Sequence, residues 1–298
     1  MSKKKTAKEW FLKGYKYDTI YSDFDKAIKA YKKTLELDDT FIDAYINLGF
    51  IYLEKDDYDK AVECFSKVTE AELDNPEAYN NLGYAYEKLE RFGSAKQIYE
   101  RAIELNPRDI EAIINIGHIK DLQADYEGAV KQYKKAIEID SNAVDPHFCL
   151  GVLYDRHDMF DEAMECYRRV LEIDPNHIKA FFNMGNLYIQ QGDYNNAKES
   201  FISILGLEPY NAEVWNNLGA VYEEMEKYKE AASAYQKSLS MNSYQEEAQF
   251  NLARIDYLRN KSNLDDSKKE EIIRRLHFIL SINIRHKRAS QLLKKLED

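Results

Sequence analysis

The chain has 298 residues, of which 44% are hydrophobic and 32% are charged, and its formal net charge is −11. This acidic balance argues against nucleic acid as the main partner, because binding a phosphate backbone needs a basic surface. With only five prolines and 11 glycines, the composition is typical of a folded, soluble, helix-rich protein with few flexible linkers.

The charge is unevenly distributed along the chain. Residues 254–298 contain 12 Lys/Arg and 7 Asp/Glu, a net charge of +5, so the first 253 residues carry a net charge of −16. A basic end on an acidic body is expected to be a solvated helix surface, or else a contact for an acidic partner or for a second copy of the chain.

Three features of the sequence predict a cytoplasmic location. The first ten residues, MSKKKTAKEW, are not followed by the apolar segment of a signal peptide, and no stretch approaches the 18 apolar residues of a membrane span. The three cysteines, Cys64, Cys149 and Cys166, form no CxxC pair, which favours a reducing compartment without a disulfide framework.

Glycines recur at a constant spacing through most of the chain. Each lies inside a helical apolar pattern, where glycine costs about 1 kcal/mol relative to alanine. The six are 34 residues apart: Gly49, Gly83, Gly117, Gly151, Gly185 and Gly219. A fixed period of this length indicates an array of structural repeats rather than one globular core.

The segment 76–109 shows what one repeat contains. Its first half places apolar residues on one helical face, a polar turn follows at residues 90–92, and its second half forms another apolar stripe before Asn106 and Pro107. The unit is therefore predicted to be an antiparallel helix pair that buries its apolar faces only against neighbouring pairs. The two stripes are Tyr79, Leu82, Gly83 and Tyr86, and then Ala95, Tyr99, Ala102 and Leu105.

The pattern W/Y-x2-L-G-x2-Y, followed by A-x3-Y/F-x2-A and a closing proline, resembles the tetratricopeptide repeat (TPR), whose period is 34 residues. The resemblance implies an all-α αα-superhelix. It covers almost the whole chain, as about eight repeats over 7–284 with an enlarged loop at 260–266, and a capping helix at 285–298. The expected repeats are 7–41, 42–75, 76–109, 110–143, 144–177, 178–211, 212–245 and 246–284.

With Pro76 counted as position 1, the repeats agree at the positions that should form the core. Position 8 is glycine and position 20 is alanine, which we expect where two helices cross so closely that a larger side chain would separate their backbones. Position 24 is always Phe or Tyr, and positions 4 and 11 are mostly aromatic. Gln249 is a polar exception at position 4 of the last repeat.

No catalytic or cofactor-binding motif is present. The sequence contains no GxSxG, Walker, HExxH or GxGxxG motif, and its six histidines have no metal-ligand spacing. We therefore expect a protein that is not an enzyme and that needs neither a cofactor nor a metal.

The resemblance implies that the first helices line a concave groove, in which positions 2, 5, 6, 9, 12 and 13 face a ligand. Position 6 is asparagine in all the repeats from residue 42 onward except one, where it is Cys149. A row of primary amides can pair with both groups of a peptide backbone, but asparagine is also common in the family at this position, so both interpretations stay open. The asparagines are Asn47, Asn81, Asn115, Asn183, Asn217 and Asn251.

The predicted groove contains acidic and apolar residues as well as the amides. Position 2 is acidic in six of seven repeats, including Glu77, Glu111 and Asp145. Acids there stabilise the helix dipole, or they attract basic partners. Positions 5 and 9 add Tyr84, Phe148, Phe182 and Asn186 as binding residues, with Phe50 and Phe250 as further apolar anchors.

These features predict a non-enzymatic adaptor or scaffold that binds an extended or helical protein segment, neutral to basic and with apolar anchors, in its groove. One alternative is a structural unit that self-associates through its basic C-terminal end. Another is a subunit that recruits substrates for a separate enzyme. No nucleic acid and no membrane span are expected.

Overall fold

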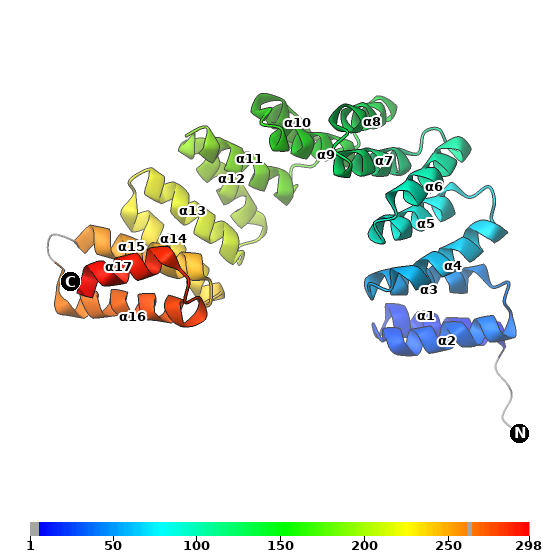
Figure 1. The fold of residues 1–298 in the computed structure, drawn as a ribbon, viewed down its shortest axis with the longest axis horizontal. Helices are drawn as coiled ribbons and strands as arrows, with labels where there is room; N and C mark the ends of the chain where they lie inside the picture. The colour runs from blue at the N-terminus through cyan, green and yellow to red at the C-terminus, as the bar shows by residue number, and fades with distance from the viewer. Residues whose placement is uncertain (1–5, 261–263, 298) are drawn as a thin grey trace, which may run out of the picture. The chain divides into compact units, whose positions relative to one another are not determined.

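The structure is a computed structural model that describes residues 6–260 and 264–297. Within those residues it contains 17 helices and no strand, so the predicted all-α fold class is confirmed. The chain divides into two compact units, residues 1–153 and 154–298, and the division falls inside one helix. Each unit is a stack of helix pairs, coloured blue to green and green to red respectively in Figure 1.

Unit 1 contains four helix pairs and most of a fifth first helix. Successive pairs pack against one another, and α5 also touches the next first helix, α7. The first helices are α1 (Ala7–Thr19), α3 (Ile42–Glu54), α5 (Pro76–Lys88), α7 (Ile110–Leu122) and, up to Leu153, α9 (Val144–Arg156). The second helices are α2 (Phe24–Leu37), α4 (Tyr58–Ala71), α6 (Phe92–Leu105) and α8 (Tyr126–Ile139).

Unit 2 begins in α9 and continues with the same alternation. Its second helices are α10 (Phe160–Ile173), α12 (Tyr194–Leu207), α14 (Tyr228–Met241) and α16 (Asp266–Ile282). Its other first helices are α11 (Ile178–Gln190), α13 (Ala212–Glu224), α15 (Glu246–Asn260) and α17 (Lys287–Glu297). The predicted enlarged loop at 260–266 falls partly on residues 261–263, which lie outside the described residues.

Local capping fixes where most of the first helices begin. The side chains of Asn75, Asp109, His177 and Asn211 each accept a hydrogen bond from a backbone N–H in the first turn of the helix that follows. These bonds satisfy donors that a helix start leaves unpaired. Pro76 adds a residue whose fixed φ suits the first helical position.

A tight turn joins the two helices of a pair. In the third pair Glu90 has a positive φ of 56°, and the N–H of Arg91 donates to the carbonyl of Tyr86 at 2.9 Å. The equivalent residue of other pairs also has a positive φ: Asp56, Ala124, Asp158, Gly192 and Glu226. Only Gly192 is a glycine, so the tertiary structure imposes this left-handed conformation on residues that disfavour it.

The glycine at position 8 makes room for an aromatic ring. A Cβ added to Gly83 would lie 2.6 Å from Cε1 of Tyr99, which is fully buried on the second helix of the same pair. From the sequence, we expected this glycine to mark a close crossing of two helix backbones. The structure corrects that interpretation, because an aromatic side chain fills the space. The same contact joins Gly14 to Tyr31, Gly49 to Phe65, Gly117 to Tyr133, Gly185 to Phe201, and Gly219 to Tyr235.

The helix α17, which was predicted as a capping helix, resembles the first helix of a pair in its buried residues. Its residue Ala289 is fully buried, as is Ala248 at position 3 of α15, and the N–H of Ala289 donates to Nδ1 of His286 at 3.0 Å. At the position that holds glycine in the first helices from α1 to α13, and Ala253 in α15, α17 has the exposed residue Lys294.

Candidate functional site

Two of the buried tyrosines at position 24 donate a hydrogen bond to a carboxylate at position 12 of the same repeat. The hydroxyl of Tyr99 donates to Glu87 at 3.2 Å, and that of Tyr235 donates to Glu223 at 3.2 Å. Burial, followed by the nearby carboxylate, raises the pKa of both phenols, which therefore stay protonated donors. Position 12 acids are thus part of the packing in these repeats.

The residue types at positions 12 and 24 vary together in the sequence, a pattern on which none of our predictions was based. Tyrosine at position 24 accompanies an acid at position 12, whereas phenylalanine accompanies an apolar residue. The two apolar pairs are Phe65 with Leu53 and Phe201 with Ile189. Where phenylalanine replaces tyrosine, the next first helix therefore faces a ring without a hydroxyl.

The predicted asparagine row divides into bonded and unbonded amides. The Nδ2 of Asn47 donates to the hydroxyl of Tyr31, and that of Asn183 donates to the hydroxyl of Tyr167, both at 3.1 Å. These two amides bind the framework. Among the described residues, the other predicted asparagines have no side-chain hydrogen bond: Asn81, Asn115, Asn217 and Asn251.

A pocket of about 530 Å³ opens on α3, α5 and the start of α7, and we call it the Tyr84 pocket. It combines three predicted site residues, Asn81, Tyr84 and Glu111, with the predicted anchor Phe50. Phe50 and Tyr84 are 42% and 39% exposed, so both rings are available to a ligand. The remaining lining residues are Leu53, Glu54, Asp56, Tyr58 and Lys88.

Sequence reasoning missed these five residues, which lie at the ends of α3 and α5, in the turn after α3 and at the start of α4. The hydroxyl of Tyr58 donates to Asp56 at 2.5 Å, which places a phenol beside a carboxylate at the rim. Asp56 is the turn residue with positive φ. That side chains at turn positions line this pocket was not evident from the helical spacing alone.

Carboxylates of successive first helices lie close to one another in unit 1. Partial burial of its carboxyl group raises the pKa of Glu111, and the negative charges of Asp109, Glu77 and Asp145 raise it further. Of these, Glu77, Glu111 and Asp145 occupy position 2 of three consecutive repeats, and we call them the carboxylate row. Within residues 6–260 and 264–297 none of the three forms an ion pair, so the row carries negative charge beside the Tyr84 pocket.

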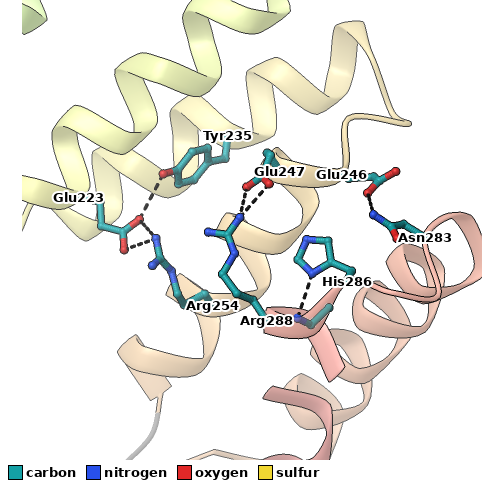
Figure 2. A network of polar contacts seen from close by, with 9 residues as sticks. Glu223, Tyr235, Glu246, Glu247, Arg254, Asn283, His286 and Arg288 are labelled. Carbon is teal, nitrogen blue, oxygen red and sulfur yellow. Dashed lines mark hydrogen bonds and ion pairs between the residues drawn. The ribbon is translucent and has the colours of Figure 1, made fainter. Parts of the chain in front are cut away.

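The equivalent row in unit 2 contains cations. Lys179 occupies position 2 of α11, and Nη2 of Arg288 on α17 binds both carboxylate oxygens of Glu247 at 2.7 and 2.8 Å (Figure 2). Arg254 likewise binds Glu223 at 2.6 Å. The basic side chains Arg254 and Arg288 therefore neutralise acids of their own unit.

The structure corrects one predicted anchor. Phe250 is only 4% exposed, because Arg288 of α17, whose guanidinium lies 4.8 Å from the ring centre, and the ring of His286 just before α17 cover it. The remaining predicted residues lie apart from the Tyr84 pocket. Phe182 packs edge-on against Phe201, and Phe148 and Asn186 are half-buried.

Four repeats later, at a distance of 136 residues in the sequence, the equivalent residues of unit 2 do not reproduce the lining of the Tyr84 pocket. Tyr194, Ile189 and Asn217 match Tyr58, Leu53 and Asn81, so the framework is shared. The functional side chains differ, because Phe50 is replaced by Asn186, Tyr84 by Ala220 and Glu54 by Gln190. The combination of aromatic rings and carboxylates therefore belongs to unit 1.

The described residues 6–260 and 264–297 contain no group of three or more His, Cys, Asp or Glu side chains placed to hold a metal ion. In the same residues, every helix is too short or too polar to cross a bilayer.

Comparisons with known proteins agree on one family. The TPR repeat model matches residues 123–157 and 159–192, and tetratricopeptide repeat models match residues 21–83, 76–109, 178–211 and 212–244. No curated protein matches the chain.

Solved structures of similar fold include the C-terminal part of a TPR repeat-containing protein from Cytophaga hutchinsonii. Its TM-score is 0.67 at 18% identity, over 82% of this chain and 97% of that one. A chain of the APC/C hetero-tetramer Cut9-Hcn1 has a TM-score of 0.57 at 19% identity; the match covers 93% of this chain but 55% of that one.

YrrB, a TPR protein with an unusual peptide-binding site, has a TM-score of 0.51 at 21% identity over 63% of this chain and 97% of its own. At these identities the similarity concerns the fold. The repeated matches along the sequence and the stacked helix pairs together show that the chain belongs to the tetratricopeptide repeat family.

Proposed function

We propose that unit 1 binds a neutral-to-basic segment of a partner protein on the face formed by α3, α5 and α7, and that the chain is a non-enzymatic adaptor or scaffold. The observation that carries this proposal is the Tyr84 pocket, where two exposed rings, three carboxylates and the unbonded amide of Asn81 converge. In general terms, TPR repeats support a role as a protein–protein interaction scaffold.

Each part of the pocket has a distinct task in the proposal. The rings of Phe50 and Tyr84 bury apolar side chains of the partner, and aromatic anchors of this kind dominate many interfaces. Asn81 pairs with the partner's backbone, since Phe65 offers it no hydroxyl. The carboxylate row concentrates basic segments near the pocket.

The alternative of self-association through the basic C-terminal end has less support. Arg254 and Arg288 already bind Glu223 and Glu247 within unit 2, so part of that basic charge is neutralised internally. Recruitment of substrates for a separate enzyme remains a special case of the adaptor proposal. The division into eight repeats and the cytoplasmic location also stay predictions.

The test uses two labelled peptides with the same leucine pattern, one with lysines and one with glutamates between the leucines. Fluorescence anisotropy of the full chain should show binding of the lysine peptide alone, weakening as salt increases. Glu111→Gln should weaken binding. Glu127→Gln is the matched control, because Glu127 is also an acid in the first turn of a unit 1 helix, α8, but does not line the pocket.

Equal binding of both peptides, or equal effects of the two substitutions, would contradict the proposed role of the carboxylates. No binding of the lysine peptide at low salt would contradict the proposed function as a whole.

A further inference from the structure

The Tyr84 pocket contains a cation of its own. The ammonium group of Lys88, in the last turn of α5, lies over the ring of Tyr84 at 4.8 Å from its centre. Among the described residues, Lys88 is the single Lys or Arg that lines the pocket, together with the carboxylates of Glu54, Asp56 and Glu111. Within this part of the chain it forms no ion pair, so its resting position is the ring face rather than a carboxylate.

A second lysine, which neighbours two pocket acids in the sequence, does not enter the pocket. Lys55 stands between the two pocket acids Glu54 and Asp56, yet its ammonium binds Asp25 on α2 at 3.1 Å. It does not line the pocket. Removal of either lysine thus removes one positive charge near the same acids, but only Lys88 covers the ring of Tyr84.

The corresponding residues of unit 2 lack this arrangement. Ala220 and Glu224 stand where unit 1 has Tyr84 and Lys88, and Glu224 accepts a hydrogen bond from Tyr194 at 3.3 Å. The repeat framework therefore does not require a lysine over a ring at this place. The contact is a feature of the pocket itself.

We propose that Lys88 is an internal competitor, and that the partner binds by placing a lysine side chain on the face of Tyr84 that Lys88 occupies. This inference rests on the proposed function and names the group that enters the pocket. An ammonium is the group that the ring already accepts, and the three carboxylates favour a second cation at the rim.

The competition follows from the size of the ring. Two ammonium groups cannot share one face of Tyr84 without repulsion, so the partner's lysine must release Lys88 to solvent. The released cation–π contact is worth about 0.5–1 kcal/mol at an exposed site, which weakens partner binding about 2- to 5-fold. Lys88 thereby shields the ring and disfavours segments that bring no cation.

The experiment compares the full-length wild type with K88M, K55M and Y84L. Methionine keeps an apolar stem and removes the charge. The probes are the labelled leucine–lysine peptide, and n-butylammonium chloride titrated against protein whose tyrosine rings are observed by NMR. We expect K88M to bind both probes about 2- to 5-fold more tightly than K55M does. We also expect Y84L to lose the n-butylammonium response.

The outcomes separate the two proposals. If the peptide binds the wild type but K88M and K55M shift its affinity equally, net charge accounts for the effect and the competitor role of Lys88 is wrong. An n-butylammonium response that survives Y84L would also overturn it. If neither the wild type nor any variant binds the peptide, the proposed function fails first.

Discussion

The hydroxyl of Tyr99 donates to Glu87, a carboxylate that is only 9% exposed and that also contacts Nδ1 of His118 on the next first helix at 3.0 Å. One buried acid thus joins two consecutive helix pairs. Repeats that carry Phe65 or Phe201 have Leu53 or Ile189 in place of the acid, so the protein uses two alternative solutions at the same position.

We predict that Tyr99→Phe lowers the free energy of unfolding by about 1–2 kcal/mol, because Glu87 loses a donor while it stays buried. Adding Glu87→Leu should recover at least half of the loss, since the pair then matches Phe65 and Leu53. Urea unfolding of both variants measures this. A double variant less stable than Tyr99→Phe alone would contradict the alternative-pair interpretation.

Gly83→Ala is expected to destabilise the protein by about 1–2 kcal/mol. The helix propensity gained, about 1 kcal/mol, is outweighed by overpacking against the fully buried ring of Tyr99. Gly93→Ala provides the control, because a Cβ there meets no atom within 4 Å. Thermal unfolding should place the control at or above the wild type and Gly83→Ala below it; similar shifts for both would exclude the ring contact as the cause.

The asparagine row should separate into two functional classes. Asn183→Ala removes a donor to Tyr167 and is expected to lower the free energy of unfolding by about 1 kcal/mol. Asn81→Ala should change it by less than about 0.5 kcal/mol but weaken binding of the leucine–lysine peptide. Denaturant titration and anisotropy on the same two variants measure both effects, and the reverse assignment would contradict the division.

The raised pKa of Glu111 gives a pH dependence with a definite sign. Its folded pKa lies above the unfolded one, so its ionisation opposes folding at neutral pH, and this destabilisation is relieved as the pH falls through the folded pKa. Over the same range the carboxylate loses the charge that attracts a cation. Peptide affinity of the wild type should therefore fall more than that of Glu111→Gln, whereas parallel pH profiles would show that Glu111 does not contribute.

Cys64 should be inert in the folded protein. Burial is the main reason that its thiol pKa is raised to about 12, so almost no thiolate is present at about pH 8. In a Cys149→Ser/Cys166→Ser variant, a thiol reagent should label Cys64 only after denaturant unfolds unit 1. Labelling without denaturant at the rate of an exposed cysteine would contradict its burial.

The sequence was sufficient for the helix pairs and the family, because every repeat buries the same residues at the same spacing. It also indicated Asn81, Tyr84 and Glu111, although not their joint pocket. It could not show that Asn47 and Asn183 bond to tyrosines of the preceding pair, since that depends on how close two pairs pack. The burial of Phe250 depends on α17, a segment distant in sequence.

Residues that pack the helix pairs are separate from residues that contact a partner, which explains how the repeats can share one structure and still bind selectively. Glycine at position 8, alanine at position 20 and an aromatic residue at position 24 recur because each helix pair must pack in the same way. Specificity is confined to side chains that the packing leaves exposed, as the differences between Tyr84 and Ala220 and between Lys88 and Glu224 illustrate.

The central claim is that a basic protein segment binds the first-helix face of unit 1. Hydrogen–deuterium exchange of the full chain, with and without the leucine–lysine peptide, tests it most directly. We predict slower exchange in α3, α5 and α7, with α6, α8 and the part of α4 beyond its first turn unchanged. Slower exchange confined to the second helices or to unit 2 would contradict it.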